Sequence, residues 1–152
     1  MKKYLFLLIV CLCGVLAAGC SDDEDNAPVD KGIVGEWQLA AWSGDAVQQI
    51  EAYVDFRSDA SFSLYQKFTT PLFVRYDGSY STRGNLLSGI YTDGTPLGAD
   101  YEFTLSEDGN TLTLTSRTSA VETTVYTRTS IPGDVRNAPL APSMRSAAYR
   151  LL

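Results

Sequence analysis

The stretch YEFTLSEDGNTLTLTS, from Tyr101 to Ser116, decides the fold because apolar and polar residues alternate on both sides of one turn. Aromatic residues and a leucine occupy every second position before the turn, and leucines alternate with threonines after it. This two-residue period is that of a β-strand with one buried face. Between the two halves, Asp108-Gly109 suits a tight or bulged turn, since glycine tolerates positive φ. The stretch therefore predicts an antiparallel hairpin with one apolar face.

The same pattern continues outward over residues 32–132. A second turn, RSDAS, joins Phe56 to Phe62, and turn residues recur at intervals of roughly ten, which is typical of a sandwich or barrel. We expect an all-β domain of eight strands, in which Phe73–Tyr76 and Gly78–Arg83 form either two strands or one strand bent at Gly78. The other strand segments are Ile33–Trp42, Ala52–Arg57, Ser61–Phe68, Leu86–Tyr91, Ala99–Leu105, Thr111–Ser116 and Val121–Thr129.

The apolar face of these strands has to line either a packed core or a cavity. An eight-stranded barrel can be filled by side chains or can keep room for one small ligand. On the opposite faces we expect Tyr53, Tyr65 and Tyr126, which could stack on sugar rings or anchor a protein partner. The candidate ligand-lining residues are Leu39, Val54, Phe56, Phe62, Leu64, Tyr80, Tyr101 and Phe103.

The beginning of the chain has the features of an export signal. A positive start, Lys2-Lys3, precedes an apolar run from Tyr4 to Leu16, and small residues follow it. The segment from Tyr4 to Gly19 is sixteen residues long, which is short of the ~20 residues that a membrane-spanning helix needs. We therefore expect a cleaved signal peptide over residues 1–19.

The small residues end at Cys20, and there the sequence resembles the signal of bacterial lipoproteins, with Ala17 where that signal usually has leucine. The resemblance implies cleavage before Cys20, attachment of a diacylglycerol to its thiol and often acylation of the new amino terminus, so that acyl chains such as palmitate attach the protein to a membrane. Two or three acyl chains make a lasting anchor, whereas a single chain gives only reversible binding.

Residues 20–31 combine this cysteine with an acidic tether. The run SDDEDNAPVD contains a proline, has no apolar period and carries charges that repel one another, which predicts an extended linker. It also resembles the acid-rich tag that sends some lipoproteins to the outer face of the Gram-negative outer membrane. The resemblance implies an outer-membrane protein at the cell surface rather than on the periplasmic face. A solvated linker without a sorting role is the alternative.

A second resemblance begins at GEWQL, Gly35 to Leu39. Together with VDFRSDASFSLY, GSYSTRGNLLSGIY, YEFTLSEDGNTLTLTS and the closing VYTRT, it is similar to the lipocalin-like domain of Gram-negative bacterial lipoproteins. The resemblance implies an antiparallel eight-stranded barrel over residues 32–132. It also implies that Gly35 and Trp37 close one end of the barrel, with Arg128 against the Trp37 ring.

Composition excludes several kinds of chemistry. The chain has a net charge of −6 and no histidine, so nucleic acid is a poor partner and neither a Ser-His-Asp relay nor a His-ligated metal can form. Of the three cysteines only Cys20 would survive cleavage, so no disulfide framework is expected. The neighbouring carboxylates of Asp55 with Asp59 and of Asp100 with Glu102 could in principle hydrolyse glycosides, but we expect ordinary solvated charges there. We expect no enzyme activity, no metal and no cofactor.

Residues 133–152 differ in composition from the barrel. Two prolines, Pro139 and Pro142, precede the run SMRSAAYRLL, in which Ser143 is a possible helix N-cap. The segment predicts either a short amphipathic helix, packed on the barrel or touching the membrane, or a disordered tail. The residues at helical spacing are Met144, Ala147, Ala148, Leu151 and Leu152.

Together these features predict a membrane-anchored lipoprotein that carries a lipocalin-like barrel and is not an enzyme. The leading hypothesis is that it binds one small apolar or amphipathic ligand inside the barrel. The alternative is a structural or interaction module whose outer face meets a glycan or a protein. An apolar void of ~300 Å³ or more would favour the ligand, whereas a filled interior would leave only the outer face.

Overall fold

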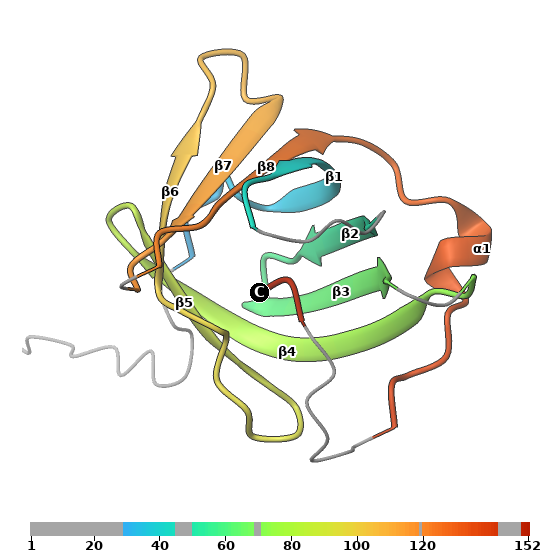
Figure 1. The fold of residues 1–152 in the computed structure, drawn as a ribbon. Helices are drawn as coiled ribbons and strands as arrows, with labels where there is room; N and C mark the ends of the chain where they lie inside the picture. The colour runs from blue at the N-terminus through green and yellow to red at the C-terminus, as the bar shows by residue number, and fades with distance from the viewer. Residues whose placement is uncertain (1–28, 45–49, 69–70, 119, 143–149) are drawn as a thin grey trace, which may run out of the picture.

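Eight antiparallel strands close into a barrel in the computed structural model of the protein (Figure 1). The structure describes residues 29–44, 50–68, 71–118, 120–142 and 150–152. The order of strands around the barrel is their order along the chain, and the last strand pairs with the first, so the predicted antiparallel eight-stranded barrel is confirmed. The strands are β1 (Gly35–Trp42), β2 (Glu51–Phe56), β3 (Ser61–Lys67), β4 (Val74–Arg83), β5 (Leu86–Tyr91), β6 (Tyr101–Leu105), β7 (Thr111–Ser116) and β8 (Thr123–Arg128).

The strands lie where the alternation of residues places them. β5 and β7 have the predicted bounds at both ends, and β4 is one continuous strand through Gly78. A side chain at Gly78 would not fit, because its Cβ would lie 2.4 Å from the Phe62 ring and 2.5 Å from the Ile90 carbonyl oxygen. Glycine therefore allows β4 to run close to both neighbouring strands.

The seams between strands differ in length. β1 and β8 close the barrel through five paired positions and one bulge. β5 and β6, by contrast, pair only at Leu86 with Glu102 and at Leu87 with Tyr101. Beyond these pairs the C-terminal half of β5 is hydrogen-bonded to the loop that follows it. The β5–β6 seam therefore has the shortest ladder among the strand pairs described.

One apolar cluster, with side chains from every strand, occupies the barrel interior. Burying one large apolar side chain contributes roughly 1.5–3 kcal/mol. We call the end where β1 begins, next to Trp37, the closed end, and the end where β3 stops and β4 begins the open end. The largest fully buried side chains of the cluster include Trp37, Tyr126, Phe56, Phe62, Ile33, Leu64, Leu87, Leu112 and Leu114.

The chain after β8 crosses the outside of the barrel. It forms the short helix α1 (Gly133–Arg136), and Val135 packs with Ile131 and Ala138 against the outward side chain of Tyr65. Residues 139–141 then run beside the start of β4. There the Arg75 N–H donates to the residue 139 carbonyl (2.9 Å), and the residue 141 N–H donates to the Arg75 carbonyl (2.8 Å).

The final described residues return into the barrel. Leu151 and Leu152 belong to the interior cluster, and Figure 1 marks this end of the chain inside the ring of strands. Neither leucine is helical, so the predicted helical stripe does not extend to them. The other residues of that predicted helix, at 143–149, lie outside the described residues.

The predicted signal peptide (1–19), Cys20 and most of the predicted tether also lie outside the described residues. Within the ranges that the structure describes, no helix has the length and apolar character needed to cross a membrane.

Candidate functional site

Trp37 and Arg128 meet at the closed end. The Trp37 indole is fully buried, and its Nε1–H donates to the Ile33 carbonyl at 2.9 Å. Arg128 is the register partner of Trp37 on β8, and its guanidinium carbon lies 4.1 Å from the centroid of the Trp37 ring. A guanidinium over an indole stabilises by ~0.5–2 kcal/mol. The contact that the lipocalin resemblance implied is therefore present.

Backbone carbonyls hold the guanidinium of Arg128 in place. Its Nε, Nη1 and Nη2 atoms donate to the carbonyls of Gly109, Val34 and Gly32 at 2.9, 3.0 and 3.0 Å. Gly35 leaves room for this group, because a Cβ there would lie 2.2 Å from Nη1. The φ of Gly35 is +140°, in a region that side-chain-bearing residues rarely adopt. These contacts hold Arg128 over the Trp37 ring, and the role of these two residues and Gly35 in closing the barrel stays a prediction.

The eight candidate ligand-lining residues lie in the interior cluster or against it. Seven have exposed fractions of 0–7%, and Leu39 is partly buried against the same cluster. Their rings pack on one another, with centroids 4.9 Å apart for Phe56 and Tyr80 and 6.2 Å apart for Phe56 and Phe62. They form packed core, and their role in lining a ligand stays a prediction. The seven buried residues are Val54, Phe56, Phe62, Leu64, Tyr80, Tyr101 and Phe103.

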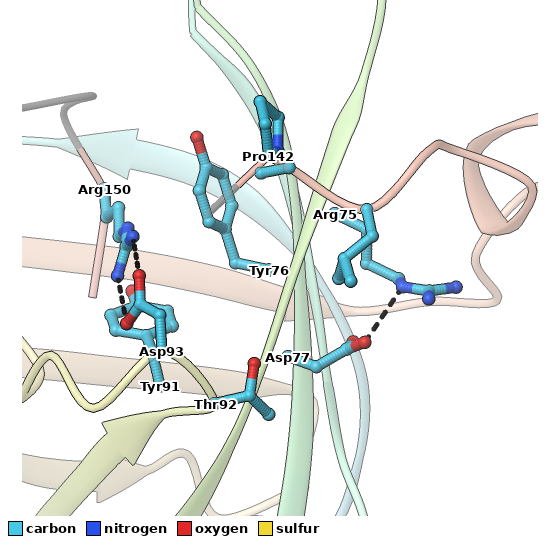
Figure 2. A pocket seen from close by; sticks show the side chains of 10 residues that line it. Arg75, Tyr76, Asp77, Tyr91, Thr92, Asp93, Pro142 and Arg150 are labelled. Atoms are coloured by element: carbon cyan, nitrogen blue, oxygen red, sulfur yellow. Dashed lines mark hydrogen bonds and ion pairs between the residues drawn. The ribbon is translucent and has the colours of Figure 1, made fainter. Parts of the chain in front are cut away.

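A cleft of about 360 Å³ lies at the open end, between β4 and the loop after β5 (Figure 2). Tyr76 and Tyr91 form its apolar wall, and both belong to the interior cluster, with ring centroids 6.1 Å apart. Residues 140–142 contribute the outer wall. The cleft therefore joins the apolar interior to a charged rim. The charged and polar lining residues are Arg75, Asp77, Thr92, Asp93 and Arg150.

Arg150 connects the charged and apolar parts of this cleft. Its Nη2 lies 2.5 Å from Asp93 Oδ2, and its guanidinium carbon lies 4.4 and 4.9 Å from the ring centroids of Tyr91 and Tyr76. The hydrogen bond from Arg150 holds the pKa of Asp93 well below its usual range. Burial raises the pKa of Tyr91 well above its usual range. At neutral pH the carboxylate is therefore charged, and the Tyr91 hydroxyl keeps the proton it donates.

Leu151 and Leu152, which follow Arg150, are buried in the interior cluster. Their exposed fractions are 5% and 1%. The Leu151 N–H donates to Gln66 Oε1 at 3.2 Å, and the Tyr91 hydroxyl donates to the Leu152 carbonyl at 2.6 Å. Residues of the chain itself thus pack in the barrel interior directly behind Tyr91.

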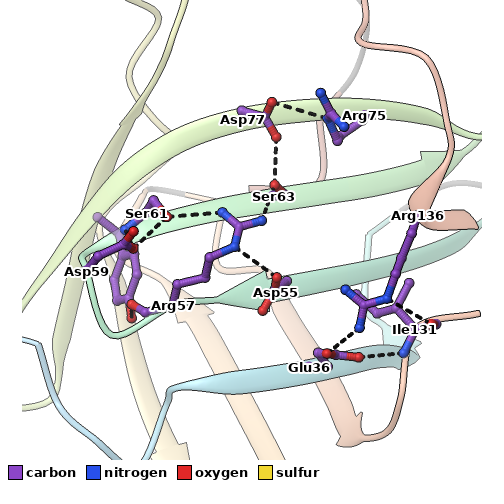
Figure 3. Close-up of polar contacts among 11 residues, drawn as sticks. Glu36, Asp55, Arg57, Asp59, Ser61, Ser63, Arg75, Asp77, Ile131 and Arg136 are labelled. Carbon is purple, nitrogen blue, oxygen red and sulfur yellow. Dashed lines mark hydrogen bonds and ion pairs between the residues drawn. The ribbon is translucent and has the colours of Figure 1, made fainter. Parts of the chain in front are cut away.

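A polar network crosses the outer face of β2, β3 and β4 and reaches the rim of the cleft (Figure 3). Arg57 Nε lies 3.0 Å from Asp55 Oδ2, and Arg57 Nη2 donates to Ser63 Oγ at 2.6 Å. Ser63 in turn donates to Asp77 Oδ1 at 2.6 Å, and Asp77 Oδ2 lies 3.2 Å from Arg75 Nε. The carboxylate of Asp59 joins the network through Ser61, which accepts from Arg57 and donates to Asp59, so these contacts hold Arg75 and Asp77 at the rim of the cleft.

The carboxylates considered for glycoside hydrolysis all have polar partners. Asp55 and Glu102 pair with arginines, and Asp59 and Asp100 each accept a serine hydroxyl at 2.6 Å. Burial raises the pKa of Asp55 and outweighs the attraction of Arg57. Within the described ranges, no group of three or more side chains is suited to holding a metal ion. These contacts are those of surface ion pairs and turns.

Of the three tyrosines expected on the outer faces, Tyr53 and Tyr65 do lie there, whereas the expectation is wrong for Tyr126. Tyr126 points into the barrel and is fully buried. It lies two positions from Arg128 on β8, and residues two apart share a face, so Tyr126 must point inward once Arg128 covers the closed end. Tyr65 does point outward, but the segment around α1 covers it, and Tyr53 is partly buried in the same outer cluster.

Sequence reasoning missed the residues of the open-end cleft. Tyr76, Tyr91, Asp93 and Arg150 come from segments far apart in the chain, and no local motif connects them. The sequence contained one usable signal, which is that Tyr76 belongs to the predicted apolar face of β4 together with Tyr80. Their even spacing places both rings on one side of the strand.

Comparison with known proteins gives one family match. A family model described as "Lipocalin-like domain" matches residues 33–134, and no curated protein sequence matches the chain. Among solved structures, the REP1-NXSQ fatty acid transporter is 11% identical, with a TM-score of 0.42 over 68% of this chain and 100% of that one. Fatty-acid-binding protein 1 of Echinococcus granulosus is 10% identical, with a TM-score of 0.42 over 66% and 100%. A de novo designed fluorescence-activating β-barrel is 14% identical, with a TM-score of 0.39 over 64% and 94%.

Proposed function

Because the chain belongs to the lipocalin-like domain family, we propose that it binds one small amphipathic molecule at the open end of the barrel, without catalysis. The observation that carries the proposal is the open-end cleft. The cleft has a volume of about 360 Å³, and its lining combines two tyrosine rings of the interior cluster with charged side chains. Ligand pockets have this size and combine apolar walls with a few fixed polar groups.

The lining of the cleft defines the chemistry of the ligand. An apolar portion would lie against Tyr76, Tyr91 and residues 140–142, and a polar head would meet the charged rim. The rim holds two arginines and two aspartates, and each aspartate is already paired with an arginine. This balance favours a neutral or zwitterionic head group over a strongly charged one.

We place no reaction in the cleft. General acid–base catalysis needs a group whose pKa lies near the working pH, whereas the pKa of Asp93 is held far below neutrality and that of Tyr91 far above it. The sequence also has no histidine that could take this role.

We further propose that Cys20 carries a lipid and that the barrel stands at the outer face of the outer membrane. Residues 21–28 would hold the barrel within about 30 Å of the membrane even when fully extended. The described chain begins at the closed end, where the Asp30 N–H donates to Thr82 Oγ1 at 2.6 Å. The cleft thus lies at the end of the barrel opposite the tether.

Metabolic labelling tests the anchor. Cells that express the chain would be grown with an alkyne-bearing palmitate analogue. We expect label on the wild-type chain and none on Cys20→Ser. The matched control is Cys11→Ser, which changes a cysteine inside the leader and should keep the label. Label that persists on Cys20→Ser contradicts the anchor, and resistance to protease on intact cells contradicts surface exposure.

Native mass spectrometry tests ligand binding. The lipoprotein purified from its own membranes should carry one small amphipathic molecule per chain, detected as a discrete mass shift. Tyr76→Ala removes half of the apolar wall of the cleft, so we expect the shift to weaken. Tyr53→Ala, the same change on the outer face, should leave it unaltered. A chain without a bound molecule that also fails to bind added fatty acid or lysolipid saturably contradicts the proposal.

A further inference from the structure

We infer that the inner part of the open end is a binding seat for an extended peptide segment, and that Arg150–Leu152 is its resident occupant, which an amphipathic ligand has to displace. Each of these three consecutive residues has a matched partner in the barrel. Figure 2 shows Arg150 above Tyr91, with its guanidinium directed at Asp93.

The seat recognises the backbone of its occupant. Gln66 Oε1 accepts the Leu151 N–H at 3.2 Å, and the Tyr91 hydroxyl donates to the Leu152 carbonyl at 2.6 Å. Gln66 and Tyr91 are each about 3% exposed. Buried polar groups require hydrogen-bond partners, and here the backbone N–H of Leu151 and the backbone oxygen of Leu152 provide them. An acyl chain could supply neither.

The seat also selects side chains. The Arg150 guanidinium lies between the Asp93 carboxylate and the faces of two tyrosine rings, which is a site for a cation. The two residues that follow insert into the apolar interior. The chemical class that fits is therefore an extended segment with a basic residue followed by two apolar residues.

The seat and the proposed ligand cleft share residues. Tyr91, Asp93 and Arg150 line the cleft, and Leu151 and Leu152 follow Arg150 into the interior cluster, to which Tyr91 also belongs. A ligand whose apolar part enters the barrel must therefore take the place of the leucines. This competition rests on the proposed function, whereas the seat itself does not.

The expected size of the competition follows from tethering. A segment joined to its own site by a short linker has an effective concentration on the order of 1 mM. If the same segment binds as a free peptide with a Kd of about 0.1 mM, the seat is occupied roughly ten times as often as it is empty. The apparent Kd of a competing ligand then rises about tenfold.

A peptide experiment tests the seat alone. The probe is a fluorescent peptide with the sequence of residues 143–152, SMRSAAYRLL, added to a chain that begins at residue 21 and lacks residues 150–152. We expect saturable binding, and at least tenfold weaker binding of the same peptide carrying Leu152→Asp. Absence of saturable binding, or equal binding of both peptides, overturns the seat.

A ligand titration tests the displacement. A dansyl-labelled lysophosphatidylcholine, whose head group is zwitterionic, would be added to the chain from residue 21 onward, to its Leu152→Asp variant and to the chain lacking residues 150–152. We expect both altered chains to bind the probe about tenfold more tightly. Val121→Asp, at an exposed position that does not line the cleft, should bind like the unaltered chain. The deletion introduces no buried charge, so it stays informative if the aspartate variant fails to fold.

The outcomes separate the two claims. Unchanged or weaker probe binding by both altered chains overturns the displacement and leaves the proposed function standing. If no chain binds the probe or an unlabelled lysolipid, the proposed function fails, and the peptide experiment still decides whether the seat exists.

Discussion

Arg128 acts at the closed end through its geometry rather than its charge. Three donors in one planar fork reach three backbone carbonyls, and the same group lies over the Trp37 ring. A lysine would keep the charge but has a compact ammonium group that cannot span these positions. The arginine thereby joins the segment before β1 to the β6–β7 turn, which contributes Gly109.

Trp37 should contribute more to the free energy of unfolding than Trp42, the other tryptophan on β1. We expect Trp37→Ala to lower the free energy of unfolding by ~3–5 kcal/mol, because it leaves a cavity under the guanidinium. Trp42→Ala is the matched control, since Trp42 lies at the opposite end of β1 and is only partly buried. Urea unfolding followed by circular dichroism measures both. Equal losses for the two variants would contradict a special role for the closed end.

Asp93 should make the docking of Arg150 depend on pH in the acid range. Its pKa is lowered in the folded chain from the ordinary 3.8, chiefly by the hydrogen bond from Arg150 and then by the Thr95 N–H. The ion pair therefore stabilises the folded chain at pH values above about 4, and this contribution is lost as pH falls through the lowered pKa. The hydroxyl groups of Tyr76 and Tyr91, whose rings face Arg150, stay protonated throughout this range.

A double-mutant cycle with Asp93→Asn and Arg150→Gln checks this dependence. We expect a coupling energy in urea unfolding that is constant from pH 5 to 8 and that vanishes under strongly acid conditions. Coupling that is already absent at pH 5 would show that the two side chains do not interact in solution.

At the scale of elements, the segment around α1 behaves as a cover for the outer face of β2 and β3. Glu36 ties it to β1, because its carboxylate accepts the Ile131 N–H at 2.6 Å and pairs with Arg136. Burial would raise the pKa of Glu36, but these two contacts outweigh burial and lower it. The helix has only four residues, which is too few to be stable alone, so packing must hold it.

Val135 is the residue through which this packing can be tested. We expect Val135→Asp to lower the free energy of unfolding by about 2–4 kcal/mol, because it places an unpaired charge against Tyr65. Val121→Asp makes the same change at a position that is 67% exposed and should cost less than about 0.5 kcal/mol. Thermal melting of the two variants side by side is the measurement. A cover that contributes nothing would give equal melting temperatures.

At the scale of the whole molecule, the strands could be predicted because their signals are local, whereas the contact between Trp37 and Arg128 was implied only by the resemblance to lipocalin-like domains. Alternation over five to ten residues placed all eight strands. Tyr126 shows where local reasoning failed. In the run Thr-Thr-Val-Tyr the apolar Val125 suggests the inward position, but the register with β1 pairs Arg128 with Trp37, which places Arg128 and Tyr126 on the face of β8 that is directed at the core. A choice between two faces needs one long-range contact to fix it.

The open end could not be predicted because its contacts join distant parts of the chain. Leu151 meets Gln66 across 85 positions of sequence, and Arg150 meets Asp93 across 57. In the sequence, the adjacent leucines Leu151 and Leu152 are compatible with two arrangements. They could belong to the apolar stripe of a helix, or they could insert into the barrel as a non-helical segment. The two arrangements can be distinguished only in the closed barrel, where Asp93 pairs with Arg150 at the open end.

The seams of the barrel determine where it opens first. β5 and β6 share two paired positions, whereas β1 and β8 share five. Three fewer paired positions mean about three fewer hydrogen bonds. At about 1 kcal/mol per hydrogen bond, this difference corresponds to roughly 100-fold faster local opening of the β5–β6 seam. The inserted end of the chain also supports this seam, because it bonds Tyr91 of β5 and lies beside Gly98 of the loop that leads to β6.

Hydrogen exchange measured by mass spectrometry should reveal this order. We expect the β6 amides that face β5, among them the Phe103 N–H bonded to the Asn85 carbonyl at 2.8 Å, to exchange about 100-fold faster than the β1–β8 amides. Removing residues 150–152 should accelerate exchange at β5 and β6 further and leave β1 and β8 unchanged, because only the first seam loses a neighbour. If the β1 and β8 amides exchanged first, or if the amides of all seams exchanged at the same rate, the number of paired positions in a seam would not control where the barrel opens. A ligand would then have no preferred side of the open end at which to enter.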